Sequence, residues 1–351
     1  MSTAAKLVLE RDLEDARRLI ESQDLSFEEG CDDLVGVFED GRLVAAAGRA
    51  GFVLKQVAIL PAHQGGDVLG ALLTELLRLG RAAGHGVFWI FTRPESVASF
   101  LPFHFRLLVT SGRAALLESG GGFEQWLAGC AGLVRPGRNG ACVINGNPFT
   151  LGHVHLVEQA CRRVDTLYVF LVREDRSVFP YAARRRLAGR ALAHLANVIV
   201  LDTSRYAVSA GTFPAYFLKR LDQVALEQMR MDLHLFGHRV APGFGIRARF
   251  VGAEPSDPTT AAYNDVMREV LPSYGIELTE FPRSSAAAPG DRTFISASKV
   301  RAALARGDRE SVRASVPAAT MEYLESPEGL AVAARLAAPR AEAKPRSGGD
   351  R

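Results

Sequence analysis

Thr150, Gly152 and His153 stand where an apolar run ends and an amphipathic helical pattern begins, in "VINGNPFTLGHVHLVEQA" at 143–160. The first turn of a helix carries unpaired N–H groups and the positive end of the helix dipole, so it suits a phosphate. Gly152 would let the backbone come close to such a group, while Thr150 and His153 can hydrogen-bond its oxygens. Taken alone, the tetrapeptide more often marks a capped helix start with a packed histidine.

A second stretch, "FISASKVRAALARG" at 294–307, again leads from an apolar residue into a helical pattern. Two hydroxyls and two cations lie at its start: Ser296, Ser298, Lys299 and Arg301. Such a set could hold the outer phosphates of a nucleotide, although a serine-capped surface helix is the alternative.

The elements around these stretches predict a doubly wound sheet. Strand-like apolar runs alternate with helical patterns at 141–144, 167–172, 198–201, 233–236 and 249–252. Alternation of this kind predicts parallel strands joined by crossovers, which bind ligands beyond their carboxyl ends. The first run ends at Asn145, so we expect the helix that follows to point its first turn into the ligand crevice.

Composition shifts divide the chain. A glycine-rich stretch at 118–140 places a boundary near Pro136 and predicts domains at 1–130 and 136–325, with a disordered Ala/Arg/Pro tail at 328–351. The first domain is expected to be a small α/β unit with strands at 34–38, 43–47, 53–60 and 87–92 and a helix at 69–83.

Charge and cysteine usage limit the function classes. The net charge of +3 is too small and dispersed to indicate a nucleic-acid or membrane surface. The four cysteines show no CxxC spacing, so neither a zinc site nor a disulfide framework is indicated. No apolar run approaches the roughly 18 residues of a membrane span, and the start of the chain is charged. These features predict a cytoplasmic protein.

Together the two stretches resemble the T/HxGH and ISxSxxR signatures of the nucleotidyltransferase superfamily. The matching residues are Thr150, Gly152, His153, Ser296, Ser298 and Arg301. The resemblance implies attack on the α-phosphate of a nucleoside triphosphate and loss of pyrophosphate, with no covalent enzyme intermediate.

Further motifs resemble one branch, the citrate lyase ligase family, over about 136–325: "NGNPFTLGH", "FPYAARRRLA", "SRYAVSAGTFPAYFLK" and "FVGAEPSDPTTAAYNDVM". The resemblance implies that ATP, with Mg²⁺, activates acetate as acetyl-AMP. The acetyl group then passes to the prosthetic-group thiol of the citrate lyase acyl carrier subunit. It also implies a GNAT-like acetyltransferase fold at the N-terminus.

The resemblance implies the following site residues. Catalytic roles fall to Thr150, His153, Lys299 and Arg301, and nucleotide contacts to Asn145, Asn147, Pro148, Phe149, Gly152, Arg184, Glu254, Ser296 and Ser298. A solvated position on an arginine-rich helix is the alternative for Arg184, and a turn for Glu254. His155 is expected to pack, and the metal ligands cannot be assigned.

The N-terminal stretch departs from the acetyltransferase pattern. Where that fold binds the pyrophosphate of coenzyme A with a glycine loop, "QGGDVLGALL" has Asp67 and Leu69. Asp67 would repel a phosphate, so we expect a structural or carrier-docking role for this domain.

Three rival functions fit the same motifs. An acetate ligase of malonate decarboxylase would use the same chemistry, while a pantetheine-phosphate-type adenylyltransferase would keep the adenylate in its product. A non-catalytic nucleotide sensor would bind ATP without releasing pyrophosphate, but the intact motif residues argue against it: Thr150, His153, Ser296, Ser298 and Arg301.

Overall fold

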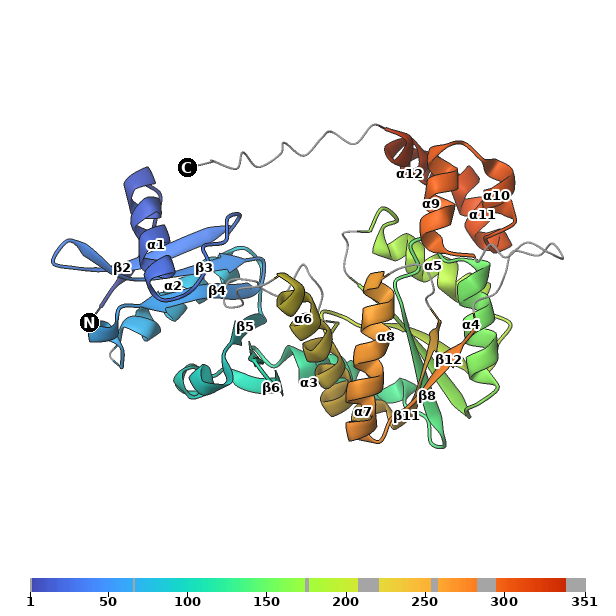
Figure 1. The fold of residues 1–351 in the computed structure, drawn as a ribbon, viewed down its shortest axis with the longest axis horizontal. Helices are drawn as coiled ribbons and strands as arrows, with labels where there is room; N and C mark the ends of the chain where they lie inside the picture. The colour runs from blue at the N-terminus through green and yellow to red at the C-terminus, as the bar shows by residue number, and fades with distance from the viewer. Residues whose placement is uncertain are drawn as a thin grey trace. The chain divides into compact units, whose positions relative to one another are not determined.

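The computed structural model describes residues 2–65, 67–173, 177–207, 221–253, 258–282 and 295–338 (Figure 1). Contacts group the chain into two compact units. The first unit comprises Met1–Val134, Arg205–Ile246 and Ser256–Glu277, and the second comprises Arg135–Ser204, Arg247–Pro255 and Leu278–Arg351. The first change of unit falls beside Pro136, and the chain changes unit at four later points that no shift in composition marks. Separate folding of 1–130 and 136–325 stays a prediction.

A seven-stranded sheet forms the centre of the first unit, in the order β1-β2-β3-β4-β5-β7-β6. Strands β4 and β5 are parallel, and the other neighbouring pairs are antiparallel. The strands are β1 (Ala4–Lys6), β2 (Asp33–Glu39), β3 (Arg42–Ala50), β4 (Val53–Ile59), β5 (Phe88–Thr92), β6 (Arg106–Ser111) and β7 (Ala114–Ser119). The four strands predicted in this region are confirmed.

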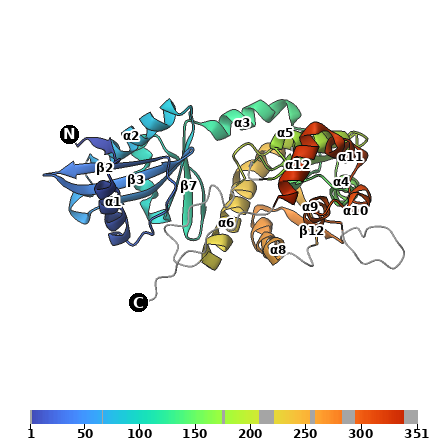
Figure 2. The same ribbon diagram turned by 90° about the horizontal axis from the view of Figure 1, so that it is seen from above.

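Two helices cover the two faces of this sheet: α1 (Glu10–Ser22) and α2 (Val68–Ala82), labelled in Figure 2. Alternate residues of a strand point to opposite faces. Accordingly Val35 packs with Leu72 and Leu76 of α2, whereas its neighbour Leu34 packs with Ile20 of α1. The helix predicted at 69–83 is therefore confirmed as α2.

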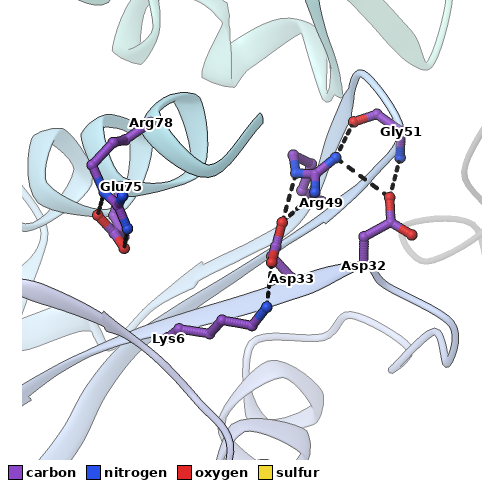
Figure 3. A network of polar contacts seen from close by, with 7 residues as sticks. All are labelled: Lys6, Asp32, Asp33, Arg49, Gly51, Glu75 and Arg78. Atoms are coloured by element: carbon purple, nitrogen blue, oxygen red, sulfur yellow. Dashed lines mark hydrogen bonds and ion pairs between the residues drawn. The ribbon is translucent and has the colours of Figure 1, made fainter. Parts of the chain in front are cut away.

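A buried ion pair joins β2 to β3 and β1 (Figure 3). Arg49 donates from Nε to Asp33 at 2.9 Å, and Lys6 Nζ lies 2.6 Å from the other carboxylate oxygen. Burial opposes ionisation of Asp33, but these hydrogen bonds outweigh it and hold the pKa of its carboxyl below the usual range. Because Asp33 and Arg49 are 6% and 4% exposed, each charge depends on the other.

Later stretches of the chain complete the first unit with α6 (Leu221–Leu235), a π-helical turn at Phe236–Val240, α7 (Ala241–Phe244) and α8 (Pro258–Val270). Two buried glutamates join residues 205–246 to the first sheet, one through α6 and the other through Tyr206. Glu227 of α6 accepts hydrogen bonds from Ser111 Oγ at 2.6 Å and from the Arg113 N–H at 3.0 Å. Glu118 of β7 accepts from Tyr206 Oη at 2.7 Å, from Trp89 Nε1 at 3.1 Å and from the Phe123 N–H at 2.9 Å.

The strand predicted at 233–236 is wrong, because these residues end α6 and begin the π-helical turn. Leu233, Leu235 and Phe236 are all buried. A short apolar run of this kind does not distinguish a buried strand from a buried helical segment.

The second unit contains a five-stranded sheet in the order β10-β9-β8-β11-β12, which carries the green and orange strands of Figure 1. The strands are β8 (Asn139–Ile144), β9 (Thr166–Leu171), β10 (Val198–Asp202), β11 (Ile246–Gly252) and β12 (Glu277–Phe281). Strands β8, β9 and β10 are parallel. The chain order runs outward from β8 in both directions, so the predicted doubly wound α/β sheet is confirmed. Strand β12 was not predicted.

Helices α4 (Leu151–Cys161), α5 (Tyr181–Ala191), α9 (Ala297–Ala305), α10 (Arg309–Arg313), α11 (Ala318–Glu325) and α12 (Pro327–Ala337) pack around this sheet. The disorder predicted from residue 328 is wrong as far as residue 337. Ser326 caps α12 by accepting from the Gly329 N–H at 3.3 Å, and Val332 is fully buried. Pro327 in the first turn and a run of alanines favour the helix. Residues 339–351 lie outside the described residues.

Candidate active site

His153 lies in the first turn of α4 and is bonded to the residue that begins the helix. Its Nδ1 accepts from the Thr150 N–H at 3.0 Å and lies 3.0 Å from Thr150 Oγ1. A backbone N–H can only donate, so Nδ1 is an acceptor and the proton of the neutral ring is on Nε2. The imidazole is thus fixed as an Nε2–H donor, which suits an anion.

Two hydrogen bonds connect the turn before α4 to the C-terminal part of the chain. Thr320, which is fully buried, donates from Oγ1 to the carbonyl oxygen of Phe149 at 3.0 Å. The Leu151 N–H donates to the carbonyl oxygen of Ser315 at 3.0 Å. The Phe149 ring lies 5.1 Å from the His153 ring, centroid to centroid. Phe149 is therefore a packing partner that fixes the imidazole from one side.

Gly152 brings the two sequence motifs together. A Cβ atom at this position would lie 3.2 Å from the carbonyl oxygen of Ile295, the residue before the cap of α9. That spacing is tighter than ordinary van der Waals contact, so α4 and the stretch before α9 approach this closely only with glycine. The glycine was predicted to face a phosphate, and the structure shows a close contact with the second motif.

Arg301 joins the second motif to the loop after β8. Its Nη1 donates to the carbonyl oxygen of Asn147 at 2.5 Å, and its Nη2 donates to Ser298 Oγ at 3.1 Å. Ser296 Oγ caps α9 by accepting from the Lys299 N–H at 3.2 Å. Lys299 itself is exposed on the first turn. Ser296 thus caps the start of α9. Lys299 and Arg301 both lie in the first turns of this helix, as predicted.

Arg184 is fully buried, so the solvated alternative for it is wrong. Its Nη1 donates to the carbonyl oxygens of Asn145 at 2.8 Å and Val172 at 2.7 Å, and its Nε donates to that of Phe179 at 3.0 Å. Arg184 therefore ties together the carboxyl ends of β8 and β9. It also brings a positive charge to the edge at which a phosphate would bind.

The two asparagines shape the loop between β8 and α4. Asn145 Oδ1 accepts from Arg184 Nη1 at 2.9 Å and from Ser177 Oγ at 3.1 Å. Asn147 Oδ1 accepts from the Phe179 N–H at 3.1 Å, and Pro148 separates it from the buried Phe149. The predicted asparagines therefore meet the stretch before α5.

The structure brings the predicted residues Asn145, Asn147, Pro148, Phe149, Thr150, Gly152, His153, Arg184, Ser296, Ser298, Lys299 and Arg301 into the second unit. Glu254 lies outside the described residues. Sequence reasoning missed Thr320, Ser315 and Ser177, whose contacts span up to 171 residues of sequence and leave no local signal. Contact roles for any of these residues stay predictions.

The described part of the chain was searched for a metal site, a reactive cysteine and a membrane-spanning helix. No cluster of three His, Cys, Asp or Glu side chains there could hold a metal ion, so the protein ligands of Mg²⁺ stay unassigned. Burial raises the pKa of Cys142 to about 12, which makes its thiol a poor nucleophile. Among the same residues, none of the helices is long and apolar enough to cross a membrane.

A family model for the citrate lyase ligase C-terminal domain matches residues 139–324. The citrate (pro-3S)-lyase ligase of Klebsiella pneumoniae is 38% identical over 316 residues, which cover 88% of this chain and 91% of the relative. The enzyme of the same name from Escherichia coli K12 is 33% identical over 317 residues, covering 88% and 89%.

Partial likenesses are also present. A phosphopantetheine adenylyltransferase of Streptococcus sanguinis is 47% identical over 59 residues, or 16% of this chain and 36% of the relative. A GNAT-family acetyltransferase structure from Desulfovibrio desulfuricans covers 34% of this chain and 99% of its own, with 18% identity and a TM-score of 0.29. Thermotoga maritima TmcAL, bound with α-thio ATP, covers 54% and 55%, with 14% identity and a TM-score of 0.36.

Proposed function

The chain belongs to the citrate lyase ligase family, and on that premise we propose that it is an AMP-forming acid–thiol ligase. It activates acetate with ATP and acetylates the prosthetic-group thiol on the acyl carrier subunit of citrate lyase. The observation that supports the proposal is the hydrogen bond from Arg301 to the carbonyl oxygen of Asn147, which joins the start of α9 to the loop between β8 and α4.

In the first step an acetate oxygen attacks the α-phosphorus of ATP. The new P–O bond gives acetyl-AMP, and the bond to the β-phosphate oxygen breaks so that pyrophosphate leaves with the electron pair. His153 donates from Nε2 to a phosphate oxygen, and Lys299 and Arg301 neutralise charge on the leaving pyrophosphate. Such a reaction needs positioning and charge stabilisation more than covalent help from the protein.

In the second step the carrier thiol, as its thiolate, attacks the acetyl carbonyl carbon of acetyl-AMP. A C–S bond forms, the C–O bond to the phosphate breaks, and AMP leaves with the electron pair. The thiol proton passes to solvent. In this proposal the acetyl group passes directly to the carrier, and the buried Cys142, whose raised pKa makes it a poor nucleophile, has no role.

Mg²⁺ accompanies ATP in this proposal and supplies charge neutralisation to the phosphate oxygens when bound. Phosphates and water satisfy much of the coordination of this ion, so it requires few protein ligands. We place the reaction in the cytoplasm, where ATP and reduced thiols are available.

ATP–pyrophosphate exchange tests the proposal. Exchange should require acetate and should fall by roughly 10² or more in His153→Ala, because a preorganised donor is lost. His155→Ala, two residues along the same helix, is the matched control and should keep the wild-type rate. Exchange driven by phosphopantetheine without acetate would contradict the proposal and would instead indicate an adenylyltransferase.

A further inference from the structure

Lysine is rare in this chain, and one lysine lies in the second motif. Five of the 42 basic residues are lysines: Lys6, Lys55, Lys219, Lys299 and Lys344. Lys219 and Lys344 lie outside the described residues. The difference from arginine matters chemically, because a guanidinium stays protonated in proteins, whereas a lysine can lose its proton and react as an amine nucleophile. Lysine is accordingly a common target of acetylation.

Two of the three lysines that the structure describes are held in ion pairs. Lys6 Nζ lies 2.6 Å from the carboxylate of the buried Asp33 (Figure 3), and Lys55 Nζ lies 2.5 Å from that of Glu28. An ammonium group that donates to a carboxylate has no electron pair with which to attack. Acetylation of Lys6 would also take one cation from the buried Asp33, which would destabilise the fold. Both amines are therefore poorly placed to react.

Lys299 differs from these two lysines. It is exposed in the first turn of α9, and no carboxylate among the described residues pairs with its side chain. Its backbone N–H donates to Ser296 Oγ at 3.2 Å, so the helix cap fixes the main chain but not the amine. The helix dipole disfavours a cation at this end. Conversion of the ammonium to an amide would therefore break no ion pair and would remove a charge that the helix does not favour.

Contacts on both sides of Lys299 in the sequence connect it to the start of α4, where His153 lies. Before it, the carbonyl oxygen of Ile295 lies 3.2 Å from the position that a Cβ atom on Gly152 would take. After it, Arg301 donates to the carbonyl oxygen of Asn147. The flexible four-carbon stem of a lysine lets its amine reach the space around such a helix start. Lys299 is thus the described lysine that lies with the residues expected to hold the nucleotide.

We propose that Lys299 is a self-acetylation site, at which acetyl-AMP modifies the enzyme when no carrier thiol is present. The inference rests on the proposed function for the formation of acetyl-AMP. The neutral amine attacks the acetyl carbonyl carbon, and a C–N bond forms. The C–O bond to the phosphate breaks, AMP leaves with the electron pair, and the proton of the amine passes to solvent. Acetate and ATP supply everything that the step requires.

Acetylation of Lys299 acts as a brake on acetate activation. The amide has no positive charge, so it cannot neutralise charge on the leaving pyrophosphate. The carrier thiolate competes for the same acetyl group, because bound acetyl-AMP reacts with the nucleophile that is placed beside it. Cys161 is a poor competitor, because it ends α4 and burial raises the pKa of its thiol. The modification therefore limits the consumption of ATP when the carrier is absent.

Peptide mass spectrometry on the full-length protein tests the site. The protein is incubated with ATP, Mg²⁺ and isotopically labelled acetate, without the carrier. The label should appear on Lys299 roughly tenfold faster than on Lys55 or more, because acetyl-AMP is held beside Lys299. Deacetylated carrier subunit, added in excess, should suppress this labelling. Lys55→Arg is the matched control, because it keeps a cation beside Glu28, and its Lys299 should be labelled at the wild-type rate.

The rate of acetate-dependent exchange provides a second readout. In the wild type this rate should decline during the incubation as Lys299 becomes acetylated. Lys299→Arg carries a cation that cannot be acetylated, so it should keep its own starting rate. Comparison of each protein with its own starting rate removes any direct effect of the substitution on kcat. Equal fractional declines in the two proteins, equal labelling of Lys299 and Lys55, or labelling that the carrier does not suppress would each overturn the proposal.

Synthetic acetyl-AMP separates this inference from the proposed function. Acetate-dependent exchange without label on Lys299 overturns the self-acetylation and leaves the activation step intact. Absence of exchange, with acetyl groups reaching Lys299 from added acetyl-AMP, removes the activation step and keeps the modification site. His153→Ala should behave in this second way, because it forms little acetyl-AMP of its own but retains Lys299.

Discussion

Arg301 and Asn147 are hydrogen-bonded at 2.5 Å although 154 residues separate them in sequence. Since Arg301 also donates to Ser298 Oγ, one guanidinium joins the loop after β8 to the first turn of α9. The distance between the two motifs is thus set by a side chain that is itself expected to contact the triphosphate.

Arg301→Lys should lower kcat for acetate-dependent exchange at least tenfold. A lysine keeps the charge, but its single ammonium group lacks the planar fork that bonds Asn147 and Ser298 together. Steady-state exchange rates check this. Arg306→Lys, at an exposed position just after α9, is the control, and equal rates for the two variants would contradict the bridging role.

Thr320→Val should reduce kcat about tenfold with little change in the KM for ATP. The buried hydroxyl fixes the carbonyl of Phe149, whose ring packs on His153, and loss of such a hydrogen bond costs about 1–1.5 kcal/mol. Thr320→Ser should restore the rate, because it keeps the hydroxyl. A uniform loss of stability without a change in kcat would show that Thr320 does not position His153.

Asp33→Asn should lower the free energy of unfolding at neutral pH by up to about 3–5 kcal/mol, because the buried Arg49 loses its closest carboxylate and keeps the longer ion pair with Asp32 at 3.4 Å. The pKa of Asp33 is lowered in the folded state. Its stabilisation is therefore present above the unfolded pKa of about 3.9 and is lost as pH falls through the folded value.

Urea denaturation from about pH 7 to pH 3 measures this effect. The wild type should lose stability on acidification, and Asp33→Asn should lose less. Asp15→Asn breaks the surface pair with Arg18 and serves as the control, with an expected change of about 0–1 kcal/mol. Parallel pH curves for the wild type and Asp33→Asn would refute the assignment.

Tyr206→Phe should destabilise the first unit by about 1–3 kcal/mol, because the buried Glu118 loses one of its three donors. Thermal unfolding should show a lower Tm. The effect should disappear in the double variant with Glu118→Gln if the hydroxyl acts through this carboxylate. An undiminished loss in the double variant would place the role of Tyr206 elsewhere.

The sequence predicted the elements whose formation depends on neighbouring residues in the chain. Alternating apolar residues located β2 to β5, and the strand–turn–helix signature located the start of α4. The strand predicted at 233–236 was wrong because so short a run, with three apolar residues and a histidine, fits either a strand or a helix. The disorder predicted from residue 328 was wrong for residues 328–337, because the prediction relied on composition. It gave no weight to the cap at Ser326 or to the apolar Val332, which is buried in α12.

Long-range partners account for the rest. Nothing in "AARRRL" distinguishes the fully buried Arg184 from Arg185 and Arg186, which remain outside the core. The distinction depends on carbonyl oxygens that only the folded sheet presents. Thr320 has no local signature either, since its partner Phe149 lies 171 residues earlier.

The chain crosses between the two units several times, and this limits how the protein can evolve by recombination. A recombination at residue 135 would import a new N-terminal sheet but keep the native α6, whose Glu227 is matched to Ser111 and Arg113 of the old one. The hybrid would carry a buried carboxylate without its donors. Replacing the N-terminal segment by a single recombination is thus expected to destabilise the protein. We expect the two parts of the gene to evolve together.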